Sequence, residues 1–149
     1  MKRALKITFV FFFLFFGEFF AFKATAQTQS FFIDSSYDLK EREKIEAYLA
    51  RTSDLLYFYV DNSWWQELSA EDKNKVDTQL VNLSLEFKNK IYPTLTSYFG
   101  REWQPGIDNE NKITVLIHPM KKNQGGYFTI GNEYLKLENS KSNEREMIY

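Results

Sequence analysis

The sequence predicts an α/β fold, with α+β as the alternative, in which a long helix lies behind a mostly parallel sheet that has one antiparallel edge strand. Residues 55–60 and residues 112–118 are largely apolar and rich in aromatic and β-branched side chains, the pattern of strands buried on both faces. A long helical pattern separates them. Two buried strands joined by a helix form a right-handed crossover, so we expect these two strands to be parallel neighbours.

The first 26 residues have the three parts of a secretory signal peptide. Residues 1–6 are basic, residues 7–16 are apolar, and residues 24–26 fit the small-residue cleavage pattern. A membrane-spanning helix needs roughly 20 apolar residues, and Gly17 and Glu18 interrupt the run. We therefore expect cleavage after residue 26 and no stable membrane anchor. The mature chain is expected to be extracellular in a bacterium, with the periplasm as the alternative.

The expected mature chain is free of cysteine and mildly acidic. The absence of cysteine excludes both a lipid-bearing cysteine and a disulfide-stabilised fold. The whole sequence carries 19 basic and 20 acidic residues. Removal of residues 1–26 leaves 15 basic and 19 acidic residues, which gives a net charge of −4. An acidic surface argues against nucleic acid or an anionic membrane as the partner, and the length favours a single domain.

The first half of the mature chain shows four patterns. Residues 27–38 are expected to be irregular. Residues 40–51 read as a helix, because Ile45, Tyr48 and Leu49 share one helical face. The buried strand at 55–60 follows. Residues 63–66 have the Ser-x-x-Gln spacing of a capping box, which predicts a short helical turn.

The longest predicted element is a helix that begins after Ser69, where an acidic first turn suits the helix dipole. Apolar residues recur along it at helical spacing. They are Val76, Leu80, Leu83, Phe87 and Ile91. Pro93 removes a backbone donor and is expected to end or kink this helix. A second helical stretch is expected over residues 93–99, with Gly100 as its C-terminal stop.

The second half of the chain is expected to add strands. Turn residues at 105–111 lead into the strand at 112–118. After Gly125 and Gly126, residues 127–130 are expected to form the short antiparallel edge strand. Residues 146–149 read as the first part of another strand with no turn residue after it, so we expect the natural chain to continue beyond Tyr149.

Two groups of polar residues could bind a metal ion, but each has a structural explanation that we favour. His118 is the only histidine, whereas a catalytic zinc site typically takes three protein ligands, so we interpret His118 as a polar residue at a strand end. Asp108 and Glu110 lack the alternating acids and the glycine of the common calcium loop, and we interpret them as part of a turn.

A series of short motifs runs through residues 55–149. They are residues 57–61, 86–87, 91–93, 99–100, Trp103, 105–108, 113–116, 125–128, 133–134 and 142–149. Their order and spacing resemble the N-terminal part of secreted bacterial zinc metallopeptidases of the hyicolysin type. In that family a strand similar to residues 146–149 leads to a helix that carries His-Glu-x-x-His, and this sequence ends before such a motif.

The resemblance implies that residues 39–149 are an incomplete, zincin-like N-terminal lobe of a peptidase domain, inactive alone. Zinc belongs to the full-length protein, and no catalytic or zinc-binding residue is assigned within this sequence. The antiparallel edge strand of such a lobe lines the cleft, where an extended peptide adds to it through main-chain hydrogen bonds. By position, the resemblance assigns binding of the peptide or protein substrate to Gly125, Gly126, Tyr127 and Phe128.

The alternative is a secreted binding module without enzymatic activity. Its partner would be a polysaccharide or a protein, and Trp64, Trp65 and Trp103 are the candidate stacking platform. Large aromatic residues pack in cores and interfaces more often than they stack on sugars, so the peptidase interpretation is favoured.

Overall fold

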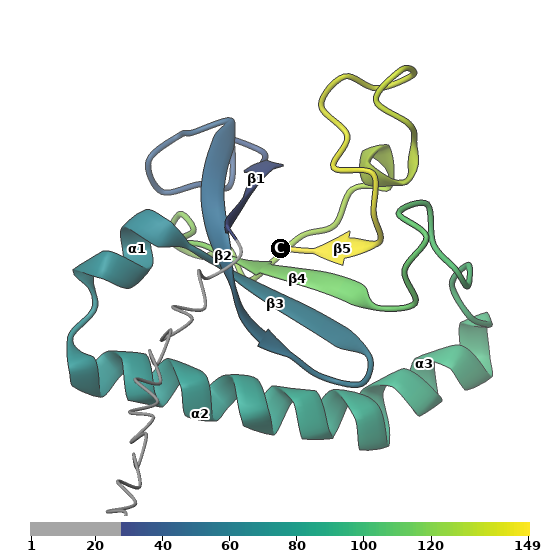
Figure 1. Cartoon of the computed structure of the whole chain (residues 1–149), viewed down its shortest axis with the longest axis horizontal. Coiled ribbons are helices and arrows are strands. Elements are labelled where there is room, and N and C mark those ends of the chain that lie inside the picture. Colours follow the sequence, from purple (N-terminus) through teal and green to yellow (C-terminus); the bar gives the residue numbers. More distant parts are fainter. Residues whose placement is uncertain (1–27) are drawn as a thin grey trace, which may run out of the picture.

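The computed structural model describes residues 28–149, which form a five-stranded mixed sheet with a long helix running along one side of it, at the bottom of Figure 1. The strands are β1 (Thr28–Phe32), β2 (Lys44–Thr52), β3 (Leu56–Asp61), β4 (Ile113–Ile117) and β5 (Met147–Ile148), and they lie side by side in that order. The expected signal peptide lies outside the described residues. Within the part that is described, no helix has the length and apolarity needed to cross a membrane.

The α/β class is confirmed, but the antiparallel strand is not where we expected it. β3, β4 and β5 are parallel neighbours, while β2 is antiparallel to both β1 and β3. Four strands therefore run in one direction, and the single opposing strand lies inside the sheet. The expected parallel pairing of the two buried strands is confirmed, since β3 and β4 pair from Leu56 opposite Ile113 to Val60 opposite Ile117.

The long helix consists of three continuous segments, α2 (Ala70–Glu86), the π-helix η1 (Phe87–Ile91) and α3 (Tyr92–Phe99). The Ser69 hydroxyl caps its start by accepting a hydrogen bond from the Asp72 backbone N–H. Pro93 does not end the helix, and it lies in the first turn of α3 directly after the wide π turn. Gly100, with φ of 84°, ends the helix as expected.

The apolar stripe of the long helix covers one face of the sheet. Leu80 and Phe87 are buried against Leu56 and Phe58 of β3. Val76 and Ile91 are partly buried at the same contact, whereas Leu83, expected on this stripe, is 38% exposed.

The prediction of a helix over residues 40–51 is wrong, because most of this segment is strand β2. Ile45 and Ala47 are buried whereas Lys44 and Glu46 are exposed, which is the two-residue period of a strand. Pairing with β1 on one side and β3 on the other satisfies its backbone groups. The irregular start expected for residues 27–38 is also wrong in part, since β1 begins at Thr28.

The short helix expected near residue 63 is present as α1 (Asn62–Glu67), but its cap is not the one expected. Asp61, the last residue of β3, is the N-cap, and its carboxylate accepts hydrogen bonds from the backbone N–H and the hydroxyl of Ser63, at 2.9 and 2.8 Å. Ser63 therefore lies inside the helix, because the carboxylate of Asp61, two residues earlier, already serves as the cap.

Candidate functional site

The edge strand expected over residues 127–130 is reduced to a single antiparallel pair. The Tyr127 N–H donates to the Tyr149 carbonyl at 3.1 Å, and the Tyr149 N–H donates back to the Tyr127 carbonyl at 2.9 Å. This exchange of both bonds is the hydrogen-bonded pair of an antiparallel ladder. The ladder ends there, because the Thr129 hydroxyl caps the 3₁₀ helix η2 (Ile130–Glu133) that follows.

Gly126 permits this close approach. Its φ of 145° is disfavoured for residues with a side chain, and a Cβ atom there would lie 2.8 Å from the Tyr149 carbonyl oxygen. Gly125 is different, since a Cβ atom would meet nothing within 4 Å. Of the four residues that the resemblance assigns to substrate binding, Gly126 and Tyr127 thus contact Tyr149 after β5, Gly125 is exposed, and Phe128 is 74% exposed.

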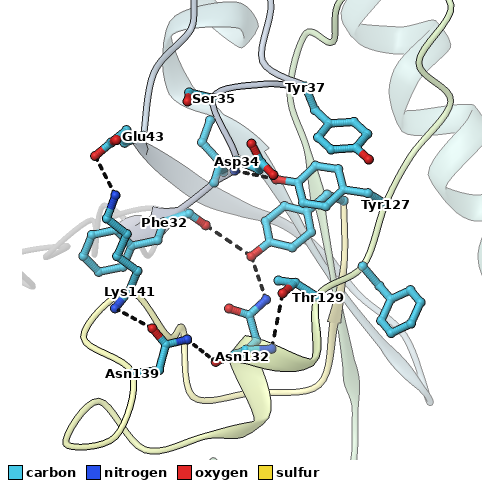
Figure 2. Close-up of a pocket in the computed structure, with 14 residues that line it drawn as sticks. Phe32, Asp34, Ser35, Tyr37, Glu43, Tyr127, Thr129, Asn132, Asn139 and Lys141 are labelled. Carbon is cyan, nitrogen blue, oxygen red and sulfur yellow. Dashed lines mark hydrogen bonds and ion pairs between the residues drawn. The ribbon is translucent and has the colours of Figure 1, made fainter.

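Three tyrosine rings are stacked at this edge. The Tyr127 ring is 4.2 Å from the Tyr149 ring, with an angle of 4° between planes, and 4.4 Å from the Tyr37 ring, with an angle of 25°. Figure 2 shows Tyr37 and Tyr127 lying one over the other. The Tyr127 hydroxyl accepts a hydrogen bond from the Asp34 N–H at 2.9 Å. Burial raises the pKa of Tyr127 well above its usual value, so the phenol stays neutral.

An open pocket of about 410 Å³ lies beside the stack, between the connection from β1 to β2 and residues 127–141 (Figure 2). Aromatic side chains of Phe32, Tyr127 and Tyr149 line it together with the amides of Asn132 and Asn139. An ion pair between Lys141 and Glu43, with 3.0 Å between the charged atoms, lies at its rim.

Two buried asparagines fix one wall of this pocket. Asn143 accepts a hydrogen bond from the Phe32 N–H and donates to the Phe32 carbonyl, both at 2.8 Å. Its side-chain amide thus makes the two hydrogen bonds that a neighbouring strand would make to β1. Asn132 donates to the Tyr149 hydroxyl at 2.8 Å. Sequence reasoning missed both residues, because nothing local distinguishes them from the other polar residues of this segment.

His118 directly follows β4, as expected for a polar residue at a strand end, and the structure adds that it is buried in a polar network. Its Nδ1 lies 3.0 Å from Asp38 Oδ1, and its ring is perpendicular to Tyr127 and Tyr149, at 6.5 and 6.4 Å. Burial alone would raise the pKa of Asp38, but hydrogen bonds from Arg42 and His118 outweigh burial and hold that pKa far below its usual range.

Arg42 joins the two carboxylates of this network. It forms a two-pronged contact with Asp38, at 2.7 and 2.9 Å, and its Nη1 lies 2.7 Å from the Asp61 carboxylate. Among residues 28–149, no three histidine, aspartate or glutamate side chains are grouped so that they could hold a metal ion. The described residues therefore do not fit a zinc site by themselves.

The other candidates lie away from this edge. Asp108 accepts a hydrogen bond from the Glu110 N–H at 3.0 Å, and Glu110 accepts one from the Tyr57 hydroxyl at 3.1 Å, in agreement with a turn before β4. The three tryptophans do not form one platform. Trp64 and Trp65 are in α1, Trp103 follows α3, and these helices lie at opposite ends of α2 (Figure 1).

Comparison with known proteins does not assign the chain to a family. The sequence matches no protein-family model and no curated protein. A functional proposal therefore depends on the geometry of the edge beside β5 and on the motifs described above.

Proposed function

We propose that residues 39–149 form the substrate-cleft lobe of a secreted zinc-dependent endopeptidase whose zinc ligands lie outside this sequence. The observation that carries the proposal is the antiparallel backbone pair between Tyr127 and Tyr149. It supports an arrangement in which residues 125–128 form the outermost strand-like segment beside β5, where the resemblance implies a cleft.

The outward backbone groups of this segment support peptide binding. Tyr127 uses its N–H and carbonyl toward Tyr149, and by strand alternation the backbone groups of Gly126 and Phe128 would face the other way. Neither residue makes a backbone hydrogen bond within residues 28–149, and both are exposed. An extended peptide can therefore add as a further strand, with main-chain hydrogen bonds to Gly126 and Phe128.

The remaining architecture is compatible with the same function. The lobe that the resemblance implies has a twisted sheet, a backing helix and an antiparallel edge, and the described fold has a counterpart of each. The basic, apolar and small-residue segments of residues 1–26 support an exported protein.

One observation favours the alternative, a secreted binding module. Tyr98, Phe99 and Trp103 are 78%, 83% and 76% exposed within six residues at the end of α3. Exposed aromatic clusters are common in surfaces that bind proteins or sugars. None of these three residues lines the pocket beside Tyr127, so the two functions can be tested separately.

The first experiment uses the secreted product of the complete reading frame. We expect about one zinc ion per molecule and casein hydrolysis that a chelator abolishes and added zinc restores. A product without zinc and without hydrolysis would contradict the peptidase proposal, and Trp103→Ala would then be compared with the native protein for polysaccharide binding.

The second experiment tests the edge itself with an N-methyl scan of a bound peptide. Each N-methyl group removes one backbone donor, and only alternate donors of an added strand face the sheet. We expect affinity to fall up to about tenfold at alternate positions and little between them. An equal effect at every position would contradict strand addition.

A further inference from the structure

The tyrosine stack places a constraint on the peptide that this edge would accept. In a sheet, residues directly opposite each other on neighbouring strands have side chains on the same face, with Cβ atoms about 4.5–5.5 Å apart. Tyr127 and Tyr149 follow this rule, because they form the hydrogen-bonded pair and their rings stack at 4.2 Å. A peptide added outside Tyr127 would bring its own facing side chain against the other side of the Tyr127 ring.

That other side is already covered by Tyr37. Its ring stacks on Tyr127 at 4.4 Å, and two rings stacked this closely on a third cannot share one of its faces. Tyr37 comes from the connection between β1 and β2, not from a strand beside Tyr127 (Figure 2). It therefore occupies the place that a facing side chain from the next strand would take.

The backbone of Tyr37 is held in position. Its carbonyl accepts a hydrogen bond from the Lys121 N–H at 2.8 Å, and its N–H donates to the Asp34 carbonyl at 3.1 Å. The next residue, Asp38, forms an antiparallel bridge with Met120 and is fully buried. The ring can turn about its own side-chain bonds, but the chain that carries it is anchored to the segment after β4.

We propose that Tyr37 determines specificity at this edge by excluding large side chains, so that the peptide residue facing Tyr127 is glycine or alanine. The inference rests on the proposed function, because it assumes that a peptide adds along residues 125–128. It assigns to Tyr37 a role in substrate selection that the motifs of the sequence do not indicate.

The test is a phenylalanine scan of a capped eight-residue peptide of alanine and serine, with affinity and cleavage measured for the full-length secreted protein. For the native protein we expect one position at which phenylalanine weakens binding about tenfold or more, since overpacking is costly. Tyr37→Ala is expected to remove that exclusion. Tyr37→Phe keeps the ring and is expected to keep the exclusion.

Leu85→Ala is the control, because it removes a large side chain that is 55% exposed on α2 and leaves the edge unchanged. Tolerance of phenylalanine at every position by the native protein would overturn the inference even if Tyr37→Ala failed to fold. Peptide binding with the same exclusion in Tyr37→Ala would overturn it while leaving strand addition intact. Absence of any peptide binding by the native protein would overturn the proposed function, and this inference with it.

Discussion

The two faces of the sheet are stabilised by different interactions. On the face covered by the long helix, Leu56 and Phe58 of β3 pack against Leu80 and Phe87. On the other face an apolar cluster that includes Phe31, Ile45, Leu116 and Tyr149 adjoins buried polar side chains. These polar residues are Asp38, Asp61, Thr114, His118, Asn132, Ser142 and Asn143.

The two faces should therefore differ in the substitutions that they tolerate. Apolar packing has no preferred direction, so the helix-covered face should accept side chains of similar volume. Buried hydrogen bonds and ion pairs are directional, and the loss of one partner leaves the other unsatisfied. The candidate site is on the polar side, which holds Tyr37, Tyr127 and Tyr149 in one arrangement.

The largest effect is expected for Arg42→Ala. Asp38 and Asp61, both buried, would lose their shared positive partner, and we expect the free energy of unfolding to fall by about 3–5 kcal/mol. Urea unfolding measures this. Lys40→Ala is the control, because its ion pair with Glu67 is exposed and should contribute at most about 1 kcal/mol. Equal effects for the two variants would show that the polar network is not important for stability.

The helix-covered face is tested by two substitutions of Leu80, which is 4% exposed. Leu80→Ala leaves a cavity and should lower the free energy of unfolding by about 2–5 kcal/mol, whereas Leu80→Met conserves volume and should cost less than about 1.5 kcal/mol. Leu83→Ala, at a half-exposed position of the same helix, should cost less than Leu80→Ala. If Leu80→Met were as harmful as Leu80→Ala, the proposed tolerance of this face would be refuted.

The edge offers a matched pair of glycines. Gly126→Ala forces a side chain into a disfavoured φ and against the Tyr149 carbonyl, at an expected cost of about 1–3 kcal/mol. Gly125→Ala meets no atom within 4 Å and should change stability by less than about 1 kcal/mol. Faster hydrogen exchange of the Tyr127 and Tyr149 amides in Gly126→Ala, but not in Gly125→Ala, would show that the backbone pair between these two tyrosines is weakened. Unchanged exchange would count against the role given to Gly126.

The smallest effect per step is expected for the loss of folding stability as the pH is lowered. The pKa of Asp38 is far below its usual value of 3.8 in the folded protein, so its ionised form stabilises the fold at higher pH. This contribution is lost as the pH falls from 3.8 toward the folded pKa, by at most about 1.4 kcal/mol per pH unit. Carboxyl ¹³C shifts in the native protein should show Asp38 still ionised at pH 3. A midpoint near 3.8 would mean that the contacts with Arg42 do not stabilise the charge.

The central unit of the fold could be predicted because its signals are local. The apolar run of β3, the Ser69 cap, the stripe of α2 and the Gly100 stop each lie within a short stretch of sequence. β2 could not be predicted in the same way. Ile45, Tyr48 and Leu49 fit a helix, whereas Ile45, Ala47 and Leu49 fit a strand, and only the pairing with β1 and β3 decides between them.

The candidate site was predictable only in part. Turn residues followed by a short aromatic segment predict a strand after Gly126, and the resemblance assigns Gly126 and Tyr127 to substrate binding, but the partners of these residues come from distant parts of the chain. The Tyr127 hydroxyl meets Asp34 across 93 residues, and Asn143 meets Phe32 across 111. No periodicity or motif indicates which residues contact each other across such a separation, so the contacts of Tyr37 and Asn143 could be identified only from the folded structure.

His118 gives this edge a natural spectroscopic probe. It is the only histidine in the sequence, and its ring lies perpendicular to both Tyr127 and Tyr149. The ring currents of those tyrosines and of the imidazole displace each other's proton resonances, and a lone imidazole gives signals free of overlap with others of its kind. A change in the arrangement of the tyrosine stack would therefore move the resonances of His118, without any label being introduced.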